Sequence, residues 1–320
     1  MPVGRPIENW QNALEIYLKE ASRHVDSYTI KKYRWNFTKM FKALEDAGLE
    51  SNPALIGDTE IRYLLDVTWA KHEASTRKWY ASTLSMVLTR FGNEILKEMN
   101  LKFPQDCRTN VNWLTPQEMM DLLDFGLTPL EATIIHLELC LGLRNVETKR
   151  LRLQDIHDGY MDVRGKGVDL GKWRTVPFHP DTKNILRIWM KERNKMIAEA
   201  QKYRPNIIVP DNLIIWKSYV KKPQIGVYSE ESNGLTKITI NRVRERLGID
   251  FENHTLRRTF GRSLWLSKRV QTETISKIYG HSDTRTTLDY IGVNLDDMSS
   301  AMGCLNDYQN ELKDKKKGGN

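Results

Sequence analysis

Apolar residues recur every three or four positions along most of this 320-residue chain, which is the spacing of helices that bury one face. The period changes once, in the stretch YMDVRGKGVDLGKWRTVPF at 160–178. Two short β-prone runs, 160–164 and 173–178, flank a glycine-rich turn region there, so we predict a β-hairpin with Lys166 near its tip. The expected fold class is therefore mainly α with a small antiparallel β-sheet.

The helical pattern divides the chain into two predicted domains. The first, 1–105, is expected to be a small helical bundle, because its apolar residues fall at helical spacing. Turn-forming residues without periodicity follow in PQDCRTNVNW, and a new helix then begins at Thr115 with a capping box. The second domain, 112–320, combines the hairpin with further helices, whereas 204–235 carries no clear pattern.

Basic residues exceed acidic ones, 49 Lys and Arg against 41 Asp and Glu, which gives a net charge of +8. This excess favours a polyanionic partner such as nucleic acid. The first domain carries basic residues that are able to contact DNA phosphates if they share one face, namely Lys31, Lys32, Arg34, Arg77 and Lys78. A solvated helix face is the alternative for each of them.

Composition also disfavours several classes of protein. No apolar run is long enough to span a bilayer, and the N-terminal MPVGRPIENW lacks the apolar stretch of a signal peptide, so we expect a cytoplasmic protein without a membrane partner. The three cysteines lie far apart, which excludes a disulfide framework and a CxxC zinc pattern. No His, Cys or carboxylate cluster has the spacing of metal ligands, so neither a metal nor a cofactor is expected.

Five short polar motifs carry the candidate chemistry: GLRNVE at 142–147, GKG at 165–167, HTLRRTF at 254–260, GH at 280–281, and Tyr290. Each has an ordinary structural explanation when it is taken alone. Arg144 follows a helix-ending glycine, where a cation neutralises a helix C-terminus. GKG is too short for a nucleotide-binding loop. His254 and Arg257 lie three residues apart, as a surface pair on a helix does, and a lone tyrosine such as Tyr290 is usually a core or rim residue.

Together, in this order and at this spacing, the motifs resemble those of the tyrosine recombinase family, the phage-type integrases, and in particular its simple two-domain Xer- or Cre-like members. The resemblance implies a helical core-binding domain at 1–105 and a catalytic domain at 112–320. It also implies a site-specific DNA recombinase that works through a 3′-phosphotyrosyl intermediate, in integration and excision or in replicon resolution. The implied active-site residues are Arg144, Lys166, His254, Arg257, His281 and Tyr290, with Glu147 as a supporting carboxylate. One position departs from the family pattern, because Arg258 stands where many members have a second histidine.

The chemistry of a phosphodiester explains why these residue types occur together. The guanidinium groups of Arg144 and Arg257 offer planar donors to negatively charged nonbridging oxygens, which a metal ion would otherwise neutralise. A phenol has a pKa of about 10, so it needs a base or positive surroundings to attack. We assign His254 to accepting the tyrosine proton or to hydrogen bonding in the transition state, and His281 to a nonbridging oxygen. Lys166 is the expected general acid for the 5′ leaving oxygen.

Two other functions share part of this pattern of motifs. A type IB topoisomerase uses the same chemistry to relax DNA, although it usually needs a larger clamp. A noncatalytic DNA-binding protein of the same fold would have lost active-site residues, and the set here is intact.

The resemblance implies double-stranded DNA and a tetramer on two sites as partners. Apolar residues from Leu295 to Tyr308 at helical spacing predict a C-terminal helix that docks on a neighbouring protomer, and packing on its own domain is the alternative.

Overall fold

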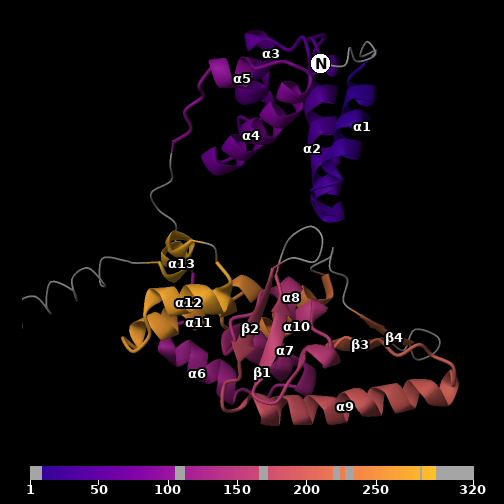
Figure 1. Ribbon diagram of the computed structural model, residues 1–320, viewed down its shortest axis with the longest axis vertical. Helices are drawn as coiled ribbons and strands as arrows, with labels where there is room; N and C mark the ends of the chain where they lie inside the picture. The colour runs from indigo at the N-terminus through magenta and orange to yellow at the C-terminus, as the bar shows by residue number, and fades with distance from the viewer. Residues whose placement is uncertain are drawn as a thin grey trace, which may run out of the picture. The chain divides into compact units, whose positions relative to one another are not determined.

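The computed structural model describes residues 9–104, 112–165, 172–218, 224–227, 234–281 and 283–292 (Figure 1). These residues form two compact units, one within 9–104 and the other within 112–292. Helices dominate both units, and the described strands make two small antiparallel sheets, so the predicted fold class is confirmed. None of the helices in these ranges has the length and apolar character needed to cross a membrane.

The N-terminal unit is a helical bundle with an aromatic core. Its helices are α1 (Trp10–Ala21), α2 (Ser27–Asp46), α3 (Asp58–Tyr63) with a following π-helical turn (Leu64–Thr68), α4 (Ala74–Arg90) and α5 (Ile95–Glu98). Trp10 stacks on Phe41 with ring centroids 5.7 Å apart, and Tyr17 meets Phe37 edge-on at the same distance. Because the two aromatic residues of each helix lie one or two turns apart and so share a face, α1 and α2 bury their aromatic faces against each other.

The C-terminal unit contains the remaining elements. Its helices are α6 (Pro116–Asp124), α7 (Pro129–Leu139), α8 (Asn145–Arg150), a 3₁₀ turn (Leu153–Asp155), α9 (Thr182–Tyr203), α10 (Gly234–Leu247), α11 (Asn253–Leu266), α12 (Thr272–Tyr279) and α13 (Thr284–Ile291). Helix α7 lies in the core and packs against both α9 and α11. Helices α11, α12 and α13 also pack against one another (Figure 1).

The predicted β-hairpin is confirmed. Strand β1 (Tyr160–Arg164) pairs antiparallel with β2 (Trp173–Pro177), and Tyr160 lies opposite Pro177. Met161, Val163 and Val176 point into the core of the unit, which explains the alternation seen in the sequence. The residues that connect the two strands, including Lys166, lie outside the described residues.

A second hairpin lies in the stretch that carried no clear sequence pattern. Strand β3 (Ile215–Ser218) pairs antiparallel with β4 (Gln224–Val227), so the described residues contain one more small sheet than the sequence predicted. Each strand has only four residues, and Lys217, Ser218 and Gly226 interrupt any β-prone run. Gly226 is needed because a Cβ there would lie 2.6 Å from a ring carbon of Trp216.

Candidate active site

Tyr290 lies in the last turn of α13, and its hydroxyl meets a histidine. The hydroxyl oxygen is 3.1 Å from Nδ1 of His254, which is in the first turn of α11. The two rings pack edge-on with centroids 4.8 Å apart. Ile291, the next residue, is fully buried and fixes the end of α13 in the unit, while Tyr290 itself is half-buried. The phenol therefore has a ready acceptor for its proton whenever Nδ1 is unprotonated.

Two arginines converge on one backbone carbonyl beside this pair. Arg257 of α11 donates to the carbonyl of Tyr279 at 2.9 Å and also to that of Gly142. Arg144, directly before α8, donates to the same Tyr279 carbonyl at 3.3 Å. Gly142 has a φ of +65°, and a Cβ there would overlap the ring of Phe260. The glycine thus permits the close turn that brings Arg144 next to α11.

A buried carboxylate holds the arginines in place. Glu147 is inaccessible to solvent and accepts hydrogen bonds from the Arg144 backbone N–H at 2.7 Å and from Arg144 Nη1 at 2.9 Å. It also accepts two hydrogen bonds of 2.8 Å from Arg174 of β2. Arg257 Nη1 lies 3.6 Å from the same carboxylate. Three guanidinium groups therefore surround one carboxylate and leave the cluster with a net charge of +2.

Arg174 is a residue that the sequence analysis missed. It stands two positions before Val176, which is buried, so strand alternation places both on the inward face of β2. A charged residue on a buried face requires a partner. That reasoning would have singled out Arg174, although not the identity of its partner.

The electrostatics of the cluster follow from burial and from these contacts. Burial alone would raise the pKa of the Glu147 carboxyl, but the bonds and charge of Arg174, and then the charges of Arg257 and Arg144, outweigh it and lower the pKa to about 2. Burial, followed by repulsion from Arg144, lowers the pKa of Arg257 to about 10. Both groups are therefore ionised at neutral pH.

His281 is neutral in this arrangement. Burial, and then the charges of Arg257, Arg144 and Arg174, lower its pKa to about 4. Its Nε2 faces Arg257 Nη2 at 3.5 Å, and its Nδ1 lies 2.9 Å from the hydroxyl of Thr287. Because a guanidinium only donates, we infer that Nε2 is the unprotonated nitrogen and that Nδ1 carries the hydrogen.

Arg144, His254, Arg257 and Tyr290 open onto a pocket in the C-terminal unit with a volume of about 310 Å³. Its lining comes from the start of α8 and from α10, α11 and α13, and comprises Arg144, Asn145, Val146, Lys237, Ile240, Asn241, Glu252, Asn253, His254, Arg257 and Tyr290. Lys237 and Asn241 on α10 were not predicted, because α10 carries no motif. The predicted residues Arg144, Glu147, His254, Arg257, His281 and Tyr290 thus lie in one connected cluster, and Lys166 falls outside the described residues.

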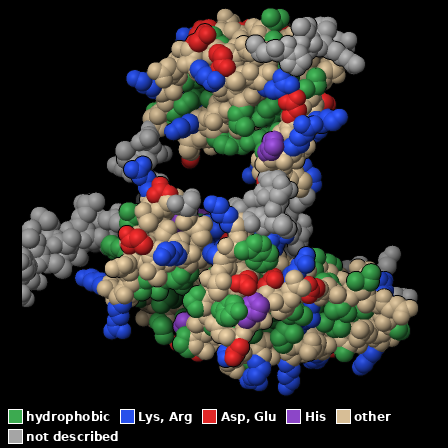
Figure 2. Space-filling view, viewed as in Figure 1, with side chains coloured by type: hydrophobic (Ala, Val, Ile, Leu, Met, Phe, Trp, Pro, Cys, Tyr) green, Lys and Arg blue, Asp and Glu red, His purple; other side chains and the backbone are tan. Residues whose placement is uncertain are grey.

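The predicted DNA-contacting residues lie on α2 and α4 of the N-terminal unit. Lys31, Lys32 and Lys78 are exposed, whereas Arg77 is half-buried. Arg34 is exposed but forms a two-pronged ion pair with Glu15 of α1. On the face shown in Figure 2, basic side chains are mixed with acidic ones rather than gathered into one patch. Their contact with DNA stays a prediction.

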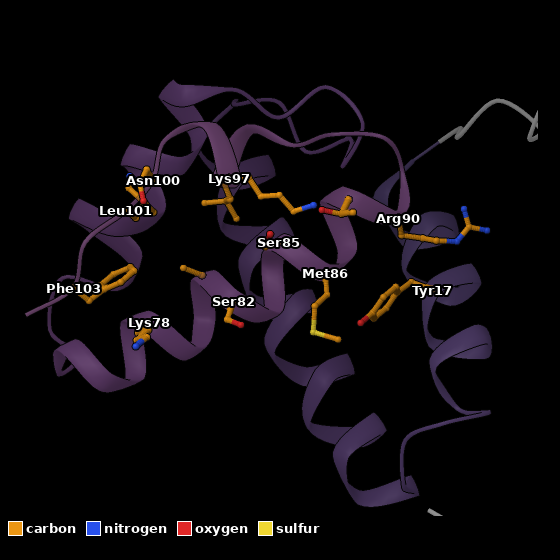
Figure 3. Close-up of a pocket in the computed structure, with 13 residues that line it drawn as sticks. Tyr17, Lys78, Ser82, Ser85, Met86, Arg90, Lys97, Asn100, Leu101 and Phe103 are labelled. Carbon is orange, nitrogen blue, oxygen red and sulfur yellow. The ribbon is translucent and has the colours of Figure 1, made fainter. Parts of the chain in front are cut away.

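The N-terminal unit also contains a broad groove, with a volume of about 910 Å³, between α1, α4 and α5 (Figure 3). Tyr17, Met86, Leu101 and Phe103 contribute apolar side chains to its lining. The lining residues include neither a histidine nor a carboxylate. Among all described residues, moreover, no group of three or more His, Cys, Asp or Glu side chains is placed to hold a metal ion.

On this mainly helical fold, a tyrosine and a histidine beside clustered arginines define the class of the two-domain tyrosine recombinases. The chain belongs to the phage integrase family, because the family's sequence model matches residues 112–296, more than half of the chain. The predicted resemblance is therefore confirmed at the level of the family.

One curated relative is similar in sequence, and several solved structures are similar in fold. The chain is 25% identical over 213 residues to the tyrosine recombinase XerA of Saccharolobus solfataricus, and the match covers 67% of this chain but only 63% of that relative's length. Among solved structures, XerH recombinase bound to a palindromic difH substrate has a TM-score of 0.63 at 17% identity, covering 92% of this chain and 83% of that one. A lambda integrase dimer bound to a core site has a TM-score of 0.62 at 19% identity, covering 88% and 94%. The Tn1549 transposon integrase in complex with transposon right-end DNA also has a TM-score of 0.62, at 17% identity, covering 92% and 99%.

Proposed function

We propose that this protein is a site-specific DNA recombinase that cuts and rejoins duplex DNA with Tyr290 as the nucleophile. The observation that carries the proposal is the 3.1 Å contact between the Tyr290 hydroxyl and His254 Nδ1, in a pocket that Arg144 and Arg257 also line. A phenol needs a proton acceptor to become a nucleophile, and the contact supplies one. Here the phenolic oxygen attacks phosphorus, its proton passes to His254, and the bond from phosphorus to the 5′ oxygen breaks.

The charges around the pocket suit the transition state of this step. Negative charge on the nonbridging oxygens is met by the +2 cluster of three arginines and Glu147, already fixed by hydrogen bonds before DNA arrives. His281 would donate to a nonbridging oxygen from Nε2 only after gaining a proton there. A bound phosphodiester anion offsets the cations that lower the pKa of His281, so it favours that protonation.

The remaining assignments complete the reaction and its partners. Lys166 is the general acid that protonates the 5′ leaving oxygen, and the phosphotyrosyl ester keeps the bond energy for attack by a second DNA end. The partner is double-stranded DNA, which the positive net charge supports, and the reaction takes place in the cytoplasm. Lambda integrase and XerH were both solved on DNA, the former as a dimer on a core site, and this supports a DNA-bound oligomer. The oligomer that we propose is a tetramer in synapsis.

Covalent capture on DNA tests the proposal. Purified protein is incubated with nicked host-genome fragments, denatured in SDS and digested, and the DNA that remains attached to peptide is sequenced. A site-specific adduct that Tyr290→Phe abolishes, while duplex binding stays within a few-fold, is the expected result. Adducts without sequence preference would indicate a topoisomerase instead. Absence of any adduct despite intact duplex binding would show that the protein does not catalyse the reaction.

A further inference from the structure

All three guanidinium nitrogens of Arg174 donate a hydrogen bond within the candidate site. Both of its terminal nitrogens donate to Glu147, one to each carboxylate oxygen at 2.8 Å, and its Nε donates to the carbonyl of Ile278 at 2.7 Å. The side chain is 10% exposed. A planar guanidinium fits this two-oxygen geometry, and a lysine does not.

These bonds fill the hydrogen-bonding capacity of Glu147. Each carboxylate oxygen accepts one bond from Arg174 and one from Arg144, which makes four bonds in all. An ionised carboxylate has about four lone-pair sites. Arg257 therefore stays 3.6 Å from the carboxylate, and its charge is not consumed by a direct hydrogen bond to it.

The third bond of Arg174 joins β2 to α12. The Ile278 carbonyl directly precedes Tyr279, whose own carbonyl accepts from Arg144 and Arg257. Gly280 follows, and a Cβ there would lie 2.9 Å from Cδ of Arg174. One side chain thus connects the hairpin, the Arg144 segment and the turn that leads to His281.

We propose that Arg174 is a positioning residue for catalysis: it saturates Glu147 so that Arg144 and Arg257 keep their charge and orientation for the scissile phosphate. The inference rests on the proposed function. Without Arg174, Glu147 would be buried with too few donors, and Arg257 would move toward it and away from the phosphate. The charge of the cluster would also fall from +2 to +1.

Two variants and one matched control test this role. Arg174→Gln removes the charge and one prong of the contact, and Arg174→Lys keeps the charge without the fork. The control is Arg193→Gln, because Arg193 of α9 is another buried arginine of the same unit and, among the described residues, donates only to the backbone carbonyls of Pro210 and Asn212. For each protein, duplex affinity, thermal midpoint and the single-turnover rate of adduct formation at saturating DNA are measured.

The expected pattern separates positioning from stability. Arg174→Gln should bind duplex DNA within a few-fold of the wild type but form adduct about 100-fold more slowly, as a misplacement of catalytic groups on the order of 1 Å does. Arg174→Lys should be intermediate. Arg193→Gln should lose thermal stability yet form adduct at close to the wild-type rate. Adduct formation by folded Arg174→Gln within about threefold of the wild type would overturn the inference.

A second readout does not depend on catalysis. Removal of the Arg174 charge should raise the pKa of His281 in the free protein, because Arg174 is one of the cations that lower it. Histidine NMR titration, with His281→Gln to assign the signal, measures this shift, and Arg193→Gln should leave the pKa unchanged. If the wild type forms no adduct, the proposed function fails, and the titration alone then decides whether Arg174 organises the cluster. An unchanged His281 pKa in Arg174→Gln would refute that organisation.

Discussion

At the scale of single residues, Glu138 is a buried carboxyl group that the proposed reaction does not use. It is inaccessible to solvent, and its Oε2 accepts a 2.8 Å bond from Asn253, the neighbour of His254. Burial raises the pKa of Glu138 to about 8, against the opposing effects of the Asn253 bond and of Lys149 and Arg257. The folded state therefore holds a proton on Glu138 that the unfolded chain releases at an ordinary carboxyl pKa.

The sign of the resulting pH dependence can be tested with Glu138→Gln. The stability linked to the bound proton is complete below pH 4.5 and is lost as the pH rises through about 8, so ionisation of this group penalises the folded wild type at alkaline pH. Glutamine mimics the protonated acid and does not ionise, so it avoids this loss of stability, which linkage puts at up to ~5 kcal/mol. Urea unfolding should thus show similar stabilities near pH 5 and a more stable variant at pH 9. An equal difference in unfolding free energy between variant and wild type at both pH values would contradict this expectation. The control is Glu245→Gln, because Glu245 is exposed.

Lys166 is tested through the bond that its proton helps to break. A sulfur in place of the bridging 5′ oxygen leaves without protonation, so Lys166→Ala should cleave the sulfur substrate at close to the wild-type rate. On normal DNA the same variant should be slower by about 10²- to 10⁴-fold, the usual contribution of a general acid. Tyr290→Phe should cleave neither substrate. If Lys166→Ala is equally slow on both, another group supplies the proton.

The family resemblance named the side chains of the candidate site, but not how they are held. His254 and Tyr290 were predicted as partners in chemistry, and the structure places them in direct contact. The partnership of Glu147 with Arg174 was not predictable, because the two are 27 positions apart and Arg174 belongs to no motif. The neutral state of His281 likewise depends on three arginines from different segments, and only the folded chain brings them together.

At the scale of elements, the close approach of α11 to α12 depends on Gly261. A Cβ at this position would lie 2.8 Å from two ring carbons of Tyr279 and closer still to its hydroxyl. The ring of Tyr279 packs under Arg257, with the guanidinium carbon 4.2 Å from the ring centroid. Any shift of α12 away from α11 therefore moves the Tyr279 carbonyl, which accepts hydrogen bonds from Arg144 and Arg257.

Gly261→Ala should accordingly lower both stability and activity. Overpacking of this kind costs about 1–3 kcal/mol of unfolding free energy, and the displaced arginines should slow adduct formation by at least about tenfold. Chemical denaturation and single-turnover cleavage measure the two effects. Gly126→Ala is the control, since nothing lies within 4 Å of a Cβ there. Unchanged stability of Gly261→Ala would show that α12 adapts without strain.

The elements themselves were predictable to different degrees. Long periodic segments such as α2 and α9 and the alternating β1–β2 pair were recognisable, because each buries one face against a core. The β3–β4 pair was not, because it has four residues a strand and is held partly by a bond from Trp216 Nε1 to the Val227 carbonyl. Such a contact between neighbouring strands leaves no periodic signal in the sequence.

At the scale of the whole molecule, the segment 295–320 is expected to act between protomers. Its apolar spacing predicts a helix, and the segment lies outside the described residues. A chain that ends at residue 294 should bind a single DNA site within a few-fold of the full chain but should assemble poorly on two sites. Native gel or sedimentation analysis on DNA measures both properties. Unchanged assembly would show that the segment packs on its own domain.

Separate hydrophobic cores predict that the two units fold separately. One core is built entirely from residues between Trp10 and Phe103, and the others entirely from residues after 112. A domain with its own core is able to fold alone, so fragments 1–109 and 110–320 should each unfold cooperatively in circular dichroism. A fragment 141–320 should not, because it lacks α7, whose buried face packs against α9 and α11. Cooperative unfolding of the intact chain together with an unfolded 1–109 fragment would instead show that the N-terminal unit requires the other for its stability.

The same fragments test DNA binding. If both units contact duplex DNA, the covalent link between them makes the second contact intramolecular, and each fragment should then bind at least 100-fold more weakly than the intact chain.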